Sequence, residues 1–180
     1  VTFEKKLTTD NLSIATTSSS TYQVSLTGAD VTNAVSFNNT AGVTLDGSTT
    51  AEGSTRFRGG LVSTASTTTV KGLVESYGAD ISLGAVTLNG ATTIASTSNA
   101  NGANTATIKT AAISGANALT IDAGTGVGAN VSVTGAITVA SLELQHATTA
   151  VFQGVTTSAA AGQIYGSLGP IGSLTVNGVV

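Results

Sequence analysis

Triplets made of an apolar residue, a serine or threonine, and a second apolar residue recur along this chain. Between Gly78 and Thr93, two of them (Ile81–Leu83 and Val86–Leu88) are separated by small corner residues. Because a strand places alternate side chains on opposite faces, each triplet turns two apolar groups one way and a hydroxyl the other. Glycine, asparagine and aspartate accept the backbone conformations of tight corners. The pattern predicts a ribbon of short, half-buried strands without helices.

The composition predicts a thin core. Hydrophobic residues make up 41% of the 180 residues, but aromatic residues make up only 4% and tryptophan is absent. A narrow stacked interior suits such residues, so we predict an all-β, right-handed parallel β-helix. A β-sandwich is the alternative, since it is also built from short, closely spaced strands. The predicted core residues are Phe3, Phe37, Phe57, Ile81, Leu83, Val86, Leu88, Ile121, Val133, Ile137, Val139 and Phe152.

The phenylalanines indicate the length of one turn. Phe37 and Phe57 are 20 residues apart, and at that length the chain would make about eight or nine turns. The most loop-like segments are residues 16–21 and 96–104. We treat residues 1–180 as one solenoid segment. Both ends are strand-like without a polar cap and no methionine occurs, so we expect a piece of a longer repetitive protein, or copies that stack end to end.

Three segments, Gly78–Thr93, Leu119–Leu144 and Gly166–Val176, resemble turns of filamentous-haemagglutinin-type and autotransporter-passenger β-solenoids, which are repeat-rich surface proteins of Gram-negative bacteria. The resemblance covers most of the chain and rests on composition and rhythm. It implies a right-handed parallel β-helix that is exported and serves adhesion, biofilm or surface-layer roles. We therefore expect an extracellular or cell-surface rod or filament that associates with like copies, with surface glycans as further partners.

The acidic residues form no catalytic motif in the sequence. β-Helical enzymes that cleave glycans need clustered carboxylates beside arginine or lysine. Stacking of turns can bring together acids that are distant in sequence, so a carbohydrate-binding or carbohydrate-cleaving β-helix is the alternative function. The acids are Glu4, Asp10, Asp30, Asp46, Glu52, Glu75, Asp80, Asp122 and Glu143.

Three tyrosines are the groups most suited to stack on sugars, namely Tyr22, Tyr77 and Tyr165. Their clustering with Glu75 or Asp80 on one exposed face would favour the carbohydrate alternative. Without such a cluster in the sequence, we predict that the protein is not an enzyme and has no catalytic residues.

The sequence predicts no metal or cofactor site. His146, the single histidine, follows Glu143 closely but lacks the sequence partners of a triad or zinc site, so it is interpreted as structural. Cysteine is absent, and Asp122 is the only acid in its glycine-rich turn. The aspartate-rich motifs of calcium-binding repeats and EF-hands do not occur.

Charge and hydropathy argue against nucleic acid and membrane partners. A net charge of −3 with six scattered basic residues offers no stripe for phosphates, and Lys5-Lys6 is interpreted as a solvated edge. No apolar run is long enough to cross a membrane.

Threonine is abundant, and Thr67–Thr69 matches the Thr-x-Thr motif of ice-binding solenoids. The motif does not recur once per predicted turn, so threonine is interpreted as a strand-forming residue.

Overall fold

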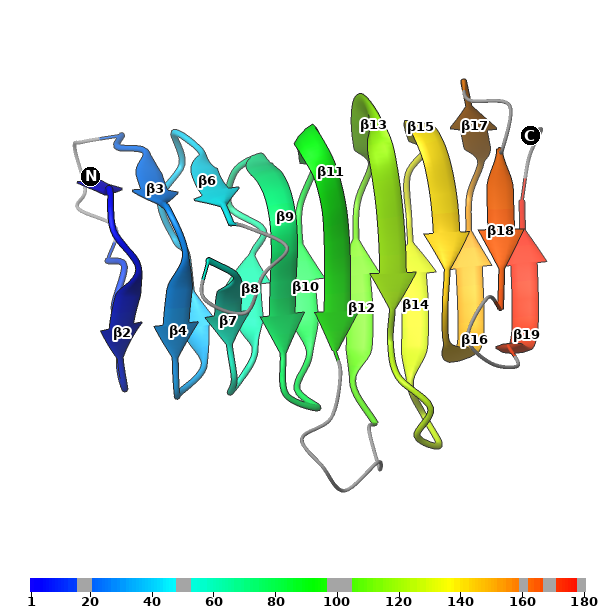
Figure 1. Cartoon of the computed structure of the whole chain (residues 1–180), viewed down its shortest axis with the longest axis horizontal. Helices are drawn as coiled ribbons and strands as arrows, with labels where there is room; N and C mark the ends of the chain where they lie inside the picture. The colour runs from blue at the N-terminus through cyan, green and yellow to red at the C-terminus, as the bar shows by residue number, and fades with distance from the viewer. Residues whose placement is uncertain (16–20, 48–52, 97–104, 159–161, 167–170, 178–180) are drawn as a thin grey trace.

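The chain winds into a right-handed parallel β-solenoid. This computed structural model describes residues 1–15, 21–47, 53–96, 105–158, 162–166 and 171–177, which form 19 strands and no helix. In Figure 1 the strands nearest the viewer run downward and those behind run upward while the chain advances from left to right, which is a right-handed winding. Since the strands pair in parallel along both sheets, the predicted β-helix is confirmed and the antiparallel sandwich is wrong.

Each turn contributes strands to three faces. The first face contains β1 (Thr2–Phe3), β3 (Val24–Leu26), β6 (Val43–Asp46), β9 (Thr68–Ser76), β11 (Val86–Ser96), β13 (Ile113–Asp122), β15 (Ile137–Leu144) and β17 (Val155–Thr157). The second face contains β2 (Leu7–Thr9), β4 (Ala29–Val31), β7 (Thr55–Phe57), the later halves of the four long strands β9, β11, β13 and β15, and β18 (Gln163–Tyr165). Because these four strands continue from one face to the next, the two faces belong to one twelve-stranded sheet.

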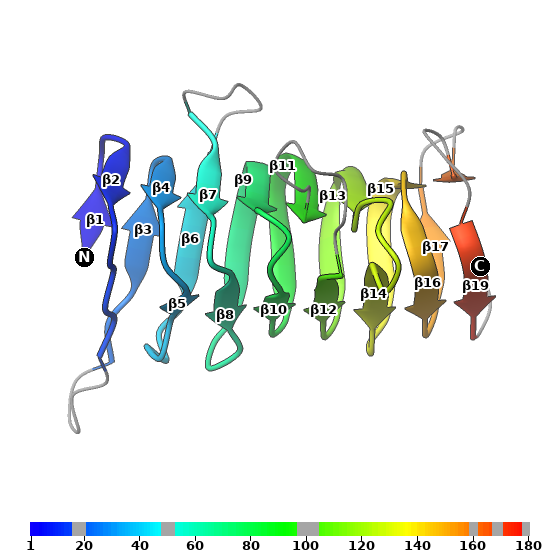
Figure 2. The ribbon, with the colours of Figure 1, turned by 90° about the horizontal axis from the view of Figure 1, so that it is seen from below.

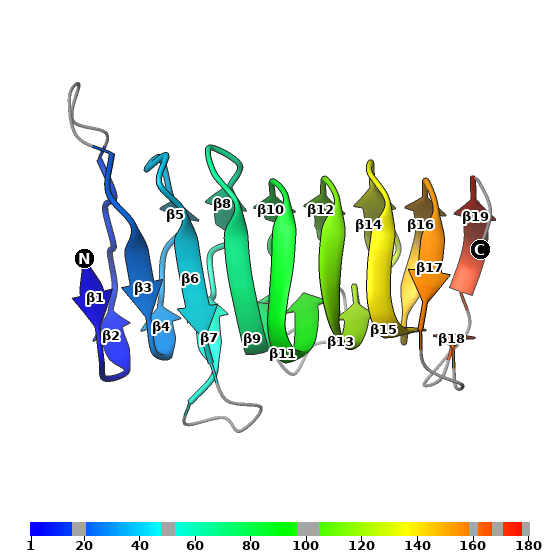
Figure 3. The same ribbon diagram turned by 90° about the horizontal axis from the view of Figure 1, so that it is seen from above.

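The third face is a separate seven-stranded sheet. It contains β5 (Val35–Ser36), β8 (Leu61–Ser63), β10 (Ile81–Leu83), β12 (Thr107–Thr110), β14 (Asn130–Val133), β16 (Ala147–Phe152) and β19 (Ile171–Val176). The view from below displays its strands side by side (Figure 2), and the view from above displays the first face (Figure 3). The solenoid is therefore closed around a narrow interior.

The turns are longer and more variable than predicted. The first face returns seven times between β1 and β17, fewer than the eight or nine turns expected. Paired residues lie 18 positions apart for Thr68 and Val86 but 27 apart for Val86 and Ile113. Loops of different length between strands explain the difference. The two segments expected to be loops, 16–21 and 96–104, lie almost entirely outside the described residues.

A single apolar core runs along the axis. Eleven of the twelve predicted core residues are buried, and the rings of Phe37 and Phe57 meet edge to face with centroids 5.9 Å apart. The exception, Phe3, is half-buried but packs against the same core. Its turn is the first of those described, so no preceding turn covers it. Burial of each large apolar side chain contributes about 1.5–3 kcal/mol to folding.

A bulge in β13 marks the bend between the first and second faces. The pairing of β13 with β15 shifts between Gly115 and Ala118. Gly115 has a φ of +134°, and a Cβ atom there would lie 2.6 Å from the carbonyl oxygen of Leu88. The amide of Asn117 donates to that same oxygen at 3.0 Å. Glycine is therefore required where two turns approach this closely.

Candidate functional site

A network of ionic side chains covers the second face of the early turns. Asp30, Arg56 and Glu75 occupy successive outward positions on β4, β7 and β9. Arg56 donates to Glu75 with an Nε–Oε2 distance of 2.7 Å. Arg58 binds Asp30 through both carboxylate oxygens, at 2.6 and 2.7 Å, and its guanidinium lies 4.7 Å from the centroid of the Tyr77 ring. We call Asp30, Arg56, Arg58, Glu75 and Tyr77 the ionic cluster.

Hydrogen bonds within the ionic cluster favour the charged forms of Asp30, Arg56 and Arg58. The hydrogen bonds from Arg58 lower the pKa of Asp30, although burial opposes them. The hydrogen bond to Asp30 raises the pKa of Arg58, and the bond to Glu75 raises that of Arg56. Two-point pairing of a guanidinium with a carboxylate is the strongest form of such contacts. Each arginine is thereby held at a fixed position on the surface.

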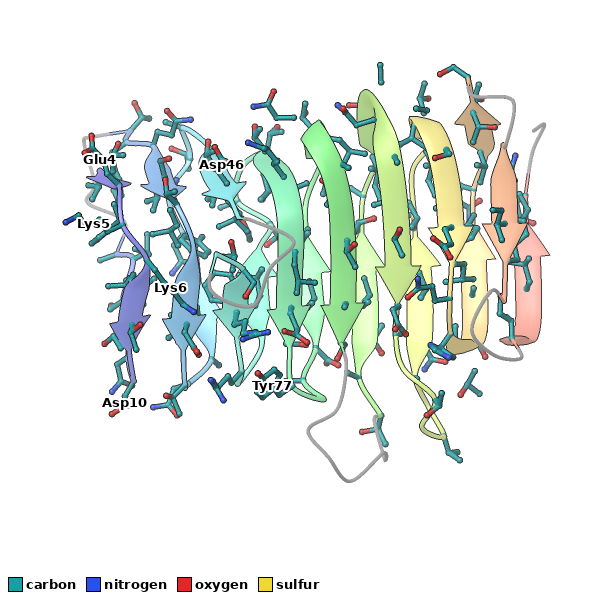
Figure 4. All side chains as sticks on the ribbon, in the orientation of Figure 1. Glu4, Lys5, Lys6, Asp10, Asp46 and Tyr77 are labelled. Carbon is teal, nitrogen blue, oxygen red and sulfur yellow. The ribbon has the colours of Figure 1, made fainter. Side chains whose placement is uncertain are left out.

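A shallow hollow lies beside the ionic cluster. It is lined by Thr8, Thr9, Asp10, Asp30, Thr32 and Arg58. The hydroxyl of Thr32 donates to Asp10 at 2.8 Å, and Asn33 donates to Asn11 at 3.0 Å, so neighbouring turns fix the rim. Figure 4 shows Asp10 and Tyr77 along the same lower edge of the molecule. The result is a preorganised polar surface with one aromatic ring.

The three tyrosines do not gather on one face. Tyr22 donates its hydroxyl to the carbonyl of Ala15 in the earliest turns. Tyr165 packs against Phe152 in the last turn, with ring centroids 6.3 Å apart. Only Tyr77 lies in a charged environment, where Arg58 stacks on it. The arrangement that would favour a sugar site is therefore present for one tyrosine of the three.

Stacking gives the single histidine a partner that sequence reasoning missed. His146 Nδ1 lies 3.0 Å from Asp122 Oδ1, and both side chains are largely buried. That Asp122 oxygen also accepts from the backbone N–H of Gly124 at 2.8 Å, and the N–H of Ala123 donates to the His146 carbonyl at 3.0 Å. The pair thus fixes the corner after β13. The separation of 24 residues between Asp122 and His146, close to the length of one turn, is the sequence signal that could have revealed this pair.

Glu143 contacts other groups than His146, its neighbour in sequence. Its Oε2 accepts from the Thr120 hydroxyl at 3.4 Å, and its Oε1 accepts from the Gln145 amide at 3.4 Å. Among the residues that the structure describes, no three histidine, aspartate or glutamate side chains are grouped so that they could hold a metal ion. The same part of the chain contains no helix that could span a membrane.

The two ends of the stack differ in charge. In the first turn, Phe3, Leu7, Leu12 and Ile14 are half-buried against the core, with charged neighbours at Glu4, Lys5 and Lys6 (Figure 4). In the last turn, Tyr165, Ile171 and Val176 are half-buried, and exposed fractions reach 37% for Leu174 and 47% for Ile164. No acidic or basic side chain other than His146 follows Glu143. Apolar side chains are therefore accessible at both ends.

No protein-family model, curated protein or solved structure matches this chain. The resemblance to filamentous-haemagglutinin-type and autotransporter-passenger proteins therefore stays a prediction from the sequence.

Proposed function

We propose that this chain is a segment of an extracellular structural or adhesive rod. The observation that supports the proposal is the unbroken stack of the first face, in which the eight strands from β1 to β17 follow one another. Parallel strands place their hydrogen bonds along the rod axis, and the apolar core follows the same direction. A load along the axis is thus shared by every ladder. In this proposal the protein has a mechanical role and no catalytic one.

The proposed partner is a like turn at each end, supplied by a second copy or by further turns of a longer chain. Strands β1, β17 and β19 each pair with only one neighbour among the described residues. Unpaired backbone groups at the edge of a sheet bind an added strand readily. The half-buried apolar groups at both ends would be covered by such stacking. End-to-end association would continue the core and all three faces.

Electron microscopy of the purified chain over a range of concentrations tests this proposal. The expected result is unbranched filaments of one solenoid width, whose length increases with protein concentration. Short particles of a single size at every concentration would contradict self-association. Antibody labelling of intact source cells tests the extracellular location, because a protein inside the cell would be labelled only after permeabilisation.

The ionic cluster favours a second candidate function, which is binding of a surface glycan. Sugars are held by stacking on an aromatic ring and by hydrogen bonds from planar polar groups. Tyr77 offers a ring that lies against Arg58, and Arg58, Asp30 and Asp10 present fixed polar groups in the adjoining hollow. The cluster would then be the adhesive part of the rod.

A glycan array compared between wild type and Tyr77→Ala tests the second candidate. Binding that Tyr77→Ala removes would support it, with Tyr22→Ala as the matched control at a separate tyrosine. Binding that both variants retain, or no binding by wild type, would contradict it.

A further inference from the structure

A single file of hydroxyl side chains runs the length of the first face. Every turn contributes one residue to the file. Each residue is the register partner of the corresponding residue on the neighbouring strand. In order along the axis they are Thr2, Ser25, Thr44, Thr69, Thr87, Ser114, Thr138 and Thr156. The strands that carry these residues form the face seen from above (Figure 3). Sequence reasoning missed it because it sought Thr-x-Thr within one strand, whereas this array forms between turns.

The later half of the hydroxyl file is open and uncharged. Its members Thr87, Ser114, Thr138 and Thr156 are exposed. The residues two positions before them are Ala85, Ala112, Ala136 and Gly154. The residues two positions after them are Asn89, Ala116, Ala140 and Ser158. Each exposed hydroxyl from β11 to β17 is therefore flanked by short, uncharged side chains.

The earlier half of the file is obstructed. Thr44 and Thr69 are half-buried, and the amide of Gln23 donates to the Thr44 hydroxyl at 3.3 Å. Asp46 and Lys71 lie two residues further along the same two strands, β6 and β9. They form an ion pair with an Nζ–Oδ1 distance of 3.2 Å. Long charged side chains order water around themselves and prevent close contact with a flat solid. Only the β11–β17 part therefore combines regular spacing with short, uncharged neighbours.

We infer that the β11–β17 part of the first face binds ice. Neighbouring strands lie about 4.8 Å apart, which is close to a repeat of the oxygen lattice of ice. Three of the four exposed members are threonines. A threonine side chain is stiff at its first torsion, so its hydroxyl and methyl groups are held in place before contact. Each hydroxyl can both donate to and accept from lattice water, while the flanking methyl groups exclude liquid water.

The chemistry of this face favours ice over a soluble glycan. None of the four exposed hydroxyl residues is flanked, two positions before or after it, by an aromatic ring, an arginine or a carboxylate. One hydroxyl per turn provides too few directional contacts to hold a flexible sugar chain against its loss of conformational freedom. A solid lattice has no such freedom to lose. Several weak, evenly spaced contacts can then act together.

Partition into a growing ice crystal tests this inference directly. The protein is frozen slowly onto a cold probe, and the fraction inside the ice is compared with that in the remaining liquid. Wild type is expected to enter the ice, and Thr138→Lys to be rejected, because a long cation in the middle of the file prevents flat contact. The matched control is Thr175→Lys, which places the same side chain on an exposed position of β19 on the third face. It is expected to enter the ice like wild type.

Two results would overturn the inference. Rejection of wild type from ice, including the case in which it binds insoluble cellulose instead, would show that the file does not match the ice lattice. Equal partition of both lysine variants would show that the hydroxyl file is not the binding face. Circular dichroism of all three proteins before freezing ensures that only folded protein is compared.

Discussion

The early and late turns share one backbone but differ in their outer surfaces. Twelve of the fifteen charged side chains precede residue 81, and only Lys109, Asp122 and Glu143 follow. The early turns hold the ionic cluster on the second face, and the late turns present hydroxyl and methyl groups on the first. The core is alike in both, with Phe57 and Phe152 fully buried. The difference teaches that stacking is set by inward residues, which leaves outward residues free to specialise.

The largest expected effect tests whether the core is equally important in both halves. Phe57→Ala in an early turn and Phe152→Ala in a late turn should each lower the free energy of unfolding by about 3–5 kcal/mol. Both leave a cavity in a closed interior that cannot collapse fully. Urea unfolding measures each value. A loss under 1 kcal/mol in one half only would show that the core is not shared.

Gly115→Ala should give the next largest effect. A Cβ atom at Gly115 meets the Leu88 carbonyl at 2.6 Å with φ at +134°, so strain of about 1–3 kcal/mol is expected. Gly154→Ala is the matched control, since the nearest atom would lie 3.8 Å away, at ordinary contact distance. Thermal unfolding should show a lower Tm for the first variant only. Equal melting of both would contradict the close approach at the bulge.

Acid should weaken the early turns, where Asp30 pairs with Arg58. The pKa of Asp30 is lowered in the folded state by Arg58, so its contribution is present above its unfolded value and is lost as pH falls through the folded one. Asp30→Asn should cost about 1 kcal/mol, because Arg58 is partly exposed and solvent screens the pair. The stability of this variant should also depend less on pH in acid than that of the wild type. Protection factors of the β4 and β7 amides, which compare exchange with the intrinsic rate at each pH, measure both effects between pH 5 and 2. Unchanged protection factors there would contradict a stabilising ion pair.

Alkali should produce the smallest effect, and in the last turn. Burial raises the pKa of Tyr165, so its neutral form is favoured in the folded state. Stability is complete below the unfolded pKa and is lost as pH rises through the folded one. Tyr165→Phe removes the ionisable group but keeps the ring against Phe152. The protection factors of the β18 amides, which compare exchange with the intrinsic base-catalysed rate, should then fall above pH 10 in wild type and fall less in the variant. Equal responses would contradict the assignment to Tyr165.

Much of the fold could be predicted from local pattern. The apolar triplets identified the strands, and eleven of twelve core residues follow from alternation along a strand. Contacts between turns could not be predicted, because they depend on register. Asp30 and Arg58 are 28 residues apart, Asp122 and His146 are 24 apart, and turn length varies with each loop. The hydroxyl file could not be predicted from the sequence for the same reason.

End-to-end stacking requires that turns continue one another in register across the boundary between copies. The chain has no cysteine, so Thr2→Cys and Thr156→Cys can be combined in one protein. Within one copy these positions are seven strand spacings apart, roughly 34 Å, too far to bond. In stacked copies they would be neighbours in the hydroxyl file at about 4.8 Å, within the range for a disulfide.

Oxidation of this double variant, followed by denaturing electrophoresis without reductant, is the most direct test. If copies stack in register, the expected result is a ladder of covalent multimers that a reductant converts back to monomers. A matched pair with Thr2→Cys and Ser132→Cys, which lies on the third face, should give monomers only. Monomers from both pairs, at concentrations where filaments would form, would contradict the claim that the solenoid extends by stacking end to end.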